Sequence, residues 1–172
     1  VVQFVLAAEG LGYSNLSYYR GGIADWIDHD EYLVIGYPSF RMWYDAHCPF
    51  DDGEHYLIDV NEEEDYTGER KAGHIPAATL VDNRTFVSMD GSNTLIDGAK
   101  TLTDALPDKD AKVVIYCSDT WCPISEWAAE VAVSLGYTNV YRLEGGYAEW
   151  ERQGNDLALG LEPGACADPM AE

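Results

Sequence analysis

Two cysteines, Cys117 and Cys122, are the residues best placed to do chemistry, and they lie in the segment VVIYCSDTWCPISEW. The apolar run Val113–Tyr116 has no polar alternation, which predicts a strand that is buried on both faces and ends at Cys117. Pro123 suits the first position of a helix, because that position needs no N–H donor. A loop that enters a helix N-terminus offers backbone N–H groups and positive dipole, which lower the pKa of a thiol. Cys117 is therefore a candidate nucleophile, and the alternative is a small buried side chain at a strand end.

Strands and helices are expected to alternate around this loop. The expected strands are Tyr56–Val60, Ala78–Val81, Val113–Tyr116 and Asn139–Leu143. The expected helices are Glu62–Lys71, Leu95–Leu106, Pro123–Leu135 and Gly146–Gln153. Such alternation predicts an α/β domain whose central sheet is mostly parallel and covered by helices on both sides. Ligands of such sheets bind beyond the carboxyl ends of the strands, which is where Cys117 is expected.

An internal repeat divides the chain. Leu11–Ile27 (LGYSNLSYYRGGIADWI) and Leu135–Glu151 (LGYTNVYRLEGGYAEWE) share Leu, Gly, Tyr, Asn, a Gly-Gly pair, Ala and Trp at a fixed offset. Self-similarity of this kind indicates two copies of one supersecondary unit. We therefore expect residues 1–37 to be the C-terminal part of a vestigial or truncated first module, and residues 38–158 to be a whole domain. Residues 159–172 are expected to form a mobile acidic tail, in which Cys166 is a free thiol.

Charge and composition limit the partners of this chain of 172 residues. Acidic residues outnumber basic ones by 31 to 10, and the net charge of −21 argues against nucleic acid and anionic membranes as partners. No apolar run approaches the roughly 20 residues of a membrane helix, so no membrane insertion is expected. The cysteines and histidines lack the close ligand pairs of structural zinc, so no metal is expected. The low lysine content suits a high-salt or exported protein and slightly favours export over the cytoplasm.

Four segments in this order resemble the rhodanese family over roughly residues 38–155. They are the LIDV strand that ends at Val60, the motif Gly73–Ala77 (GHIPA), the Cys117 loop, and the closing LGYTNV…GGYAEW. The first module would then be the end of a second rhodanese-like module. The resemblance implies a three-layer α/β sandwich and a sulfurtransferase that carries sulfane sulfur as a persulfide on the loop cysteine, without a cofactor. Its partner would be a small sulfur-containing substrate or a thiol protein.

The resemblance also implies roles for single residues. Cys117 would carry the persulfide, and the loop residues from Ser118 to Cys122 would cradle the persulfide or an incoming anion with their amides. Two motif residues, Asp59 and His74, would mainly serve the fold. The residues expected to shape the loop and bind substrate are Ser118, Asp119, Thr120 and Trp121.

The loop departs from the pattern of many active family members. Their six-residue loop ends in Arg or holds other basic residues, whereas here Cys122 is the sixth residue and Asp119 adds a carboxylate. Asn61 also stands where an Arg often follows the LIDV strand. A carboxylate disfavours a nearby thiolate and repels thiosulfate, so an efficient thiosulfate enzyme is not expected. Transfer from a persulfide, polysulfide or protein donor stays open, with Cys122 either a resolving thiol or a packing residue at the helix start.

Other functions compete with sulfur transfer. Cys117 and Cys122 could form a dithiol/disulfide redox pair, or the fold could serve as a non-catalytic binding module. A related phosphatase would need Cys, five residues and then Arg, but Pro123 occupies that position and cannot bind phosphate as Arg does. Trp127 is expected to pack on a neighbouring element, which leaves Trp121 exposed. Apolar residues such as Phe4 in the first module must pack on the main domain or on a second copy, so a homo-oligomer is an open expectation.

Overall fold

The computed structural model describes residues 32–70, 73–86 and 99–166. Its sheet has five strands in the order β1-β5-β4-β2-β3, and every strand pair is parallel. The strands are β1 (Leu33–Ile35), β2 (His55–Asp59), β3 (Thr79–Leu80), β4 (Lys112–Tyr116) and β5 (Asn139–Leu143). The helices are α3 (Tyr37–His47), α4 (Glu63–Tyr66), α5 (Ala99–Ala105), α6 (Ile124–Ser134) and α7 (Gly146–Arg152), with a 3₁₀ turn at Asn83–Thr85. The predicted α/β class with a parallel sheet is confirmed.

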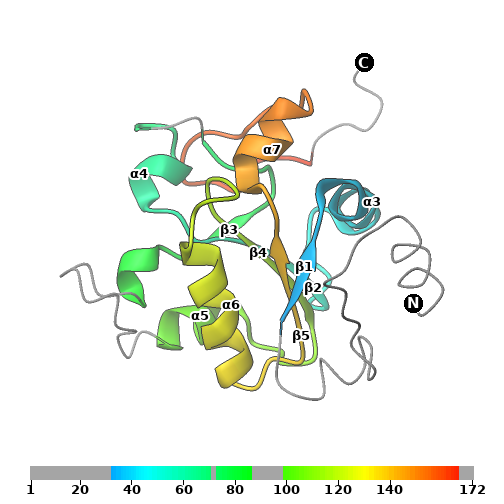
Figure 1. The fold of residues 1–172 in the computed structure, drawn as a ribbon, viewed down its shortest axis with the longest axis vertical. Coiled ribbons are helices and arrows are strands. Elements are labelled where there is room, and N and C mark those ends of the chain that lie inside the picture. Colours follow the sequence, from blue (N-terminus) through cyan, green and yellow to red (C-terminus); the bar gives the residue numbers. More distant parts are fainter. Residues whose placement is uncertain (1–31, 71–72, 87–98, 167–172) are drawn as a thin grey trace, which may run out of the picture.

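Helices cover both faces of the sheet and make three layers (Figure 1). Side chains of a strand alternate between its two faces, so Val113 and Ile115 of β4 join one core while Val114 and Tyr116 join the other. The first core includes apolar residues of α5 and α6, and the second includes aromatic residues of α3 and α7. Because β4 is central and buried on both sides, the residue at its carboxyl end is held rigidly.

Several predicted elements differ in length from the observed ones. The strand Asn139–Leu143 has the predicted bounds, and α6 is one residue shorter than predicted at each end. The predicted helix Glu62–Lys71 is only the four-residue α4, because Gly68 adopts a φ of +83° that an α-helix does not allow. Part of the predicted helix Leu95–Leu106 lies outside the described residues, as do the repeat copy Leu11–Ile27 and Phe4.

The sequence analysis missed β1 and α3. β1 pairs with β5, with Leu33 opposite Tyr141, so it extends the same sheet. α3 begins with Pro38 in its first turn and buries Phe40, Trp43 and Tyr44, which share one face at helical spacing. These two elements follow each other directly across the expected boundary at residues 37 and 38.

The C-terminal segment is attached to the domain as far as Cys166, so the prediction of a free thiol there is wrong, while the rest of the predicted tail, residues 167–172, lies outside the described residues. Cys166 forms a disulfide with Cys48, next to the end of α3, with a Cα–Cα distance of 5.9 Å. Ala158 pairs with His74 in an antiparallel bridge, and the Pro163 carbonyl accepts a hydrogen bond of 2.5 Å from the Ala77 amide. The tail thus satisfies backbone groups of the GHIPA motif, which its composition could not reveal.

Among the residues that the structure describes, no helix has the length and apolar character needed to cross a membrane.

Candidate active site

Cys117 follows directly on β4 and is almost completely buried, with 1% of its surface exposed. Its Sγ atom lies 3.3 Å from the hydroxyl of Ser125, which is buried in the first turn of α6. A serine hydroxyl can donate a hydrogen bond to a sulfur anion, and this stabilises a thiolate or a persulfide anion there. Sequence reasoning missed Ser125; its position one helical turn beyond Cys122 was the available signal.

Cys122 lies at the other end of the loop and is joined to Cys117 in a disulfide, with the two Cα atoms 6.4 Å apart. The structure therefore brings together the two predicted catalytic residues. Cys122 is partly buried and packs against the core beneath α6. A thiol in this position can react with a sulfur atom held on Cys117 without a large movement of the backbone.

Asp119 organises the loop from within. Its carboxylate accepts a hydrogen bond of 2.8 Å from the Trp121 amide, and its backbone carbonyl accepts one of 3.2 Å from the Cys122 amide. The expectation that the amides from Ser118 to Cys122 cradle a ligand is thus not met for these two in the disulfide form. An aspartate in a turn commonly accepts a hydrogen bond from the backbone amide two residues on. The presence of Asp119 two residues before Trp121 could therefore have predicted this bond.

The start of α7 supports the loop from below. The Tyr147 amide donates to the Cys117 carbonyl, and the Ala148 amide donates to the Ser118 carbonyl. Gly146 has a φ of +55°, and a Cβ atom there would lie 2.1 Å from the Cys117 carbonyl oxygen. Only glycine allows this close approach, which explains the second glycine of the GGYAEW segment.

The motif residues Asp59 and His74 are buried, and His74 contacts backbone carbonyls whereas Asp59 binds both backbone and side-chain groups. Asp59 accepts hydrogen bonds from the backbone amide and the side-chain amide of Asn61, and burial raises its pKa to about 7. The His74 ring nitrogens lie 2.8 Å from the Tyr66 carbonyl and 3.2 Å from the Pro163 carbonyl, and burial lowers the pKa of His74. Asn61, at the position where an Arg was expected, is therefore a partner of Asp59.

The outer side of the loop is open to solvent. Trp121 is 90% exposed, whereas Trp127 is half-buried against the core, as expected for each. A shallow hollow of about 230 Å³ lies beside Thr120, with Glu144 and Glu149 in its lining. A substrate that reaches the loop from this side meets an aromatic side chain and two carboxyl groups.

Comparison with known proteins agrees with this architecture. A protein from Bacillus halodurans, BH2092, is 20% identical, with a TM-score of 0.52, over 71% of this chain and 73% of that one. A protein of unknown function from Rhodopseudomonas palustris, RPA3614, described as a possible tyrosine phosphatase, is 17% identical, with a TM-score of 0.50, over 84% of this chain and all of that one. A rhodanese with anions from E. coli is 24% identical, with a TM-score of 0.41, over 55% of this chain and 89% of that one.

The comparison with curated protein sequences gives no match. The sequence profile of the Rhodanese-like domain family matches residues 43–153, which is more than half of the chain and includes the Cys117 loop. The chain therefore belongs to the rhodanese-like domain family.

Proposed function

We propose that the protein is a sulfurtransferase that carries sulfane sulfur as a persulfide on Cys117. The observation that carries the proposal is the position of this thiol. It is buried at the end of β4, within 3.3 Å of the Ser125 hydroxyl, and within bonding reach of the second thiol, Cys122. A buried sulfur anion with a hydroxyl donor is protected from water and held in one place.

The first step loads the sulfur. The Cys117 thiolate attacks the outer sulfur of a donor persulfide, the S–S bond of the donor breaks, and the donor leaves as a thiolate. The outer sulfur and its proton are then on Cys117. Ser125 supports this step because its hydroxyl lies against the attacking sulfur.

The second step releases the sulfur. An external thiol takes the outer sulfur of the Cys117 persulfide, or the Cys122 thiolate attacks the inner sulfur. In the latter case the bond between the two persulfide sulfurs breaks, the outer sulfur leaves as hydrosulfide, and Cys117 and Cys122 form a disulfide. The outer sulfur is reduced and the two thiols are oxidised, so a reducing thiol must restore the pair. The Cys117–Cys122 disulfide is the product of this branch.

The charges of the loop favour some donors over others. Asp119 lies in the loop, and Glu144 and Glu149 line the hollow beside it, so a dianion such as thiosulfate is repelled. An organic persulfide carries at most one negative charge on its sulfur pair, against two for thiosulfate, and a long polysulfide spreads its two charges over its separate ends. We therefore propose a persulfide or polysulfide donor and a thiol acceptor, and no step needs a cofactor.

The Cys117–Cys122 bond also favours a second candidate, a dithiol/disulfide redox protein. The two candidates differ in whether Cys117 holds a persulfide before the disulfide forms. A non-catalytic binding module would need neither a persulfide on Cys117 nor the Cys117–Cys122 disulfide. A phosphatase is not proposed, because Pro123 stands where the phosphate-binding Arg would be.

The test uses intact mass and sulfide release. The reduced protein, Cys117→Ser and Cys122→Ser are incubated with polysulfide, and separately with thiosulfate. We expect the wild type to release one equivalent of hydrosulfide with polysulfide and to end two hydrogens lighter, and Cys122→Ser to gain one sulfur atom that needs Cys117, whereas thiosulfate reacts slowly. Cys117→Ser should neither release hydrosulfide nor lose the two hydrogens. A loss of two hydrogens in the wild type with no sulfur retained by Cys122→Ser would favour the dithiol redox protein. Equal sulfide release by Cys117→Ser, or no change in the wild type with any donor, would overturn the proposal.

A further inference from the structure

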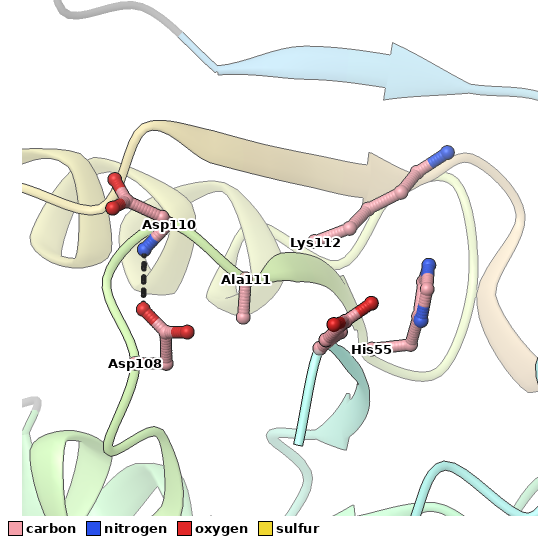
Figure 2. A pocket seen from close by; sticks show the side chains of 6 residues that line it. His55, Asp108, Asp110, Ala111 and Lys112 are labelled. Atoms are coloured by element: carbon pink, nitrogen blue, oxygen red, sulfur yellow. Dashed lines mark hydrogen bonds between the residues drawn. The ribbon is translucent and has the colours of Figure 1, made fainter. Parts of the chain in front are cut away.

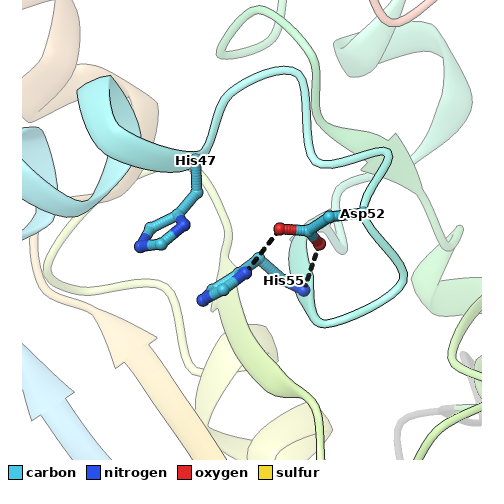
Figure 3. A group of neighbouring side chains, drawn as sticks. All are labelled: His47, Asp52 and His55. Carbon is cyan, nitrogen blue, oxygen red and sulfur yellow. Dashed lines mark hydrogen bonds and ion pairs between the residues drawn. The ribbon is translucent and has the colours of Figure 1, made fainter.

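Three potential metal ligands meet at the end of the sheet where β2 begins. His47 is the last residue of α3, Asp52 lies in the following loop, and His55 is the first residue of β2 (Figure 3). One ligand atom from each of the three lies within 4.8 Å of the others. The sequence analysis looked for zinc among closely spaced cysteines and histidines and did not consider these three residues together.

The carboxylate of the group is held by hydrogen bonds. The Asp52 Oδ1 atom accepts hydrogen bonds of 2.8 Å from the Glu54 amide and 2.9 Å from the His55 amide. Its Oδ2 atom lies 2.7 Å from His55 Nδ1. Two backbone amides and the His55 ring therefore fix the position of the Asp52 carboxyl group.

The two imidazoles are stacked face to face, and since an imidazole binds metal through a lone pair in its ring plane, one ring must turn before both can bind the same ion. The ring centroids of His47 and His55 are 3.6 Å apart, and their planes differ by 16°. A neutral imidazole has a free lone pair, which is the form that binds metal ions.

Rigid neighbours hold these ligands. Cys48 follows His47 directly, and its disulfide with Cys166 ties the end of α3 to the C-terminal segment. The ring of Trp43 lies 6.0 Å from the His47 ring and 6.2 Å from the His55 ring, and Trp43 itself stacks on Phe50 at 4.8 Å. Ligands carried by a helix end and a strand start move less than ligands carried by a free loop.

We propose that His47, Asp52 and His55 bind a divalent first-row transition metal ion, with Zn²⁺ as the representative. Two imidazoles and one carboxylate suit Zn²⁺, whereas Ca²⁺ and Mg²⁺ prefer all-oxygen sites. Ligand atoms around tetrahedral Zn²⁺ lie about 3.3 Å apart, because each bond is about 2.0–2.1 Å long. The present separations reach 4.8 Å, so binding requires the side chains to rotate toward one another while the helix end and strand start keep their backbone in place. Three protein ligands leave a fourth position for water.

The fourth position has access to solvent. His55 lines a surface hollow of about 360 Å³, and Figure 2 shows it beside Lys112, with Asp108 and Asp110 on the opposite side of the view. The carboxyl groups of Glu54, Asp108 and Asp110 favour a cation at this hollow, and the Lys112 ammonium opposes it. Lys112 is held over the ring of Tyr141, with its Nζ atom 4.6 Å from the ring centroid.

The test measures Zn²⁺ binding to the full chain by titration calorimetry, with both disulfides intact and free thiols checked to be absent. We expect one Zn²⁺ per chain and weaker binding in acid, because protons compete with metal ions for their ligands. Asp52→Asn should weaken Zn²⁺ binding by at least about tenfold, as should His47→Gln. The Asn side chain keeps an oxygen that accepts hydrogen bonds from the Glu54 and His55 amides, so we expect the loop to keep its conformation. Circular dichroism checks that the variant is folded.

Matched controls separate the site from a general effect of the acidic surface. Asp51→Asn removes the same charge one residue away and should leave Zn²⁺ binding unchanged, whereas Lys112→Gln should strengthen it. If Asp51→Asn and Asp52→Asn weaken Zn²⁺ binding equally, the ion is held by surface charge alone and the proposal is wrong. The absence of stoichiometric Zn²⁺ binding to the wild type would also overturn it.

Discussion

At the scale of single residues, the contact between Ser125 and the Cys117 sulfur makes the clearest prediction. Ser125→Ala removes a hydroxyl 3.3 Å from this sulfur, so the thiolate loses a hydrogen-bond donor. We expect the pKa of the Cys117 thiol to rise by about one unit, since a hydrogen bond to a charged group contributes roughly 1.5–3 kcal/mol. The measurement is the pH dependence of Cys117 alkylation in a Cys122→Ser background. Ser134→Ala, at the far end of α6, is the control and should leave the profile unchanged.

Asp119 is predicted to control which donors react. Asp119→Asn keeps an acceptor for the Trp121 amide but removes the charge in the loop. We expect the rate of sulfite formation from thiosulfate to rise several-fold, and the difference from the wild type to shrink at high salt, where charges are screened. Glu130→Gln on the exposed side of α6 serves as the charge control. An unchanged rate in Asp119→Asn would show that repulsion by this carboxylate does not limit the reaction.

The main residues of the site could be predicted from the sequence, but their interactions could not. The site follows a local pattern: a buried strand, a thiol, a short loop and the start of a helix. This pattern indicated Cys117 and Cys122 directly. The contact between Ser125 and Cys117 depends on the direction of the first turn of α6. The pairing of Cys166 with Cys48 joins residues 118 positions apart, and no local pattern indicates such a contact.

At the scale of elements, the sequence predicted best where apolar runs are unbroken. β4 lies near its predicted bounds, because burial on both faces leaves an apolar run, whereas β5 has its predicted bounds although it is only partly buried and includes Asn139 and Arg142. β1 has only three residues, which is too short a run to predict a strand from the sequence. It is a strand because it pairs with β5. α3 was missed because its buried face is aromatic and lies among polar residues.

The C-terminal segment is predicted to stabilise the fold through its disulfide. Cys166→Ser opens a covalent loop that spans 118 residues, which should lower the free energy of unfolding by about 2–4 kcal/mol under oxidising conditions. Urea unfolding followed by tryptophan fluorescence measures this change. Cys48→Ser should lose the same amount, and the double variant no more than either one. Losses that add in the double variant would mean that the two cysteines act separately.

At the scale of the whole molecule, buried ionisable groups couple stability to pH in opposite directions. Burial raises the pKa of Asp59 to about 7, so the folded state binds this proton more tightly than the unfolded state. Its contribution to stability is complete near pH 4 and is lost as the pH rises to about 7. Burial lowers the pKa of His74, so its contribution is lost as the pH falls below the ordinary histidine value.

Asp59→Asn should therefore change the shape of the stability profile. The neutral amide keeps an oxygen for the Asn61 amide and does not titrate, so the loss of stability between pH 4 and pH 7 should disappear. The contribution of His74 then remains, and stability should rise with pH in this range. Denaturant unfolding at several pH values measures the profile. A profile parallel to that of the wild type would contradict the assignment to Asp59.

The central claim, that Cys117 holds a persulfide before Cys122 reacts, is tested most directly by the intact mass of reduced Cys122→Ser after reaction with cysteine persulfide. Without the second thiol, the loaded state has no internal route to the disulfide. The account predicts a gain of one sulfur atom that an excess of added thiol removes: one thiol takes the outer sulfur as its own persulfide, and a second thiol then releases hydrosulfide as the two form a disulfide. A mixed disulfide between Cys117 and the cysteine of the donor, or an unchanged mass, would contradict it and favour the dithiol redox protein or the binding module.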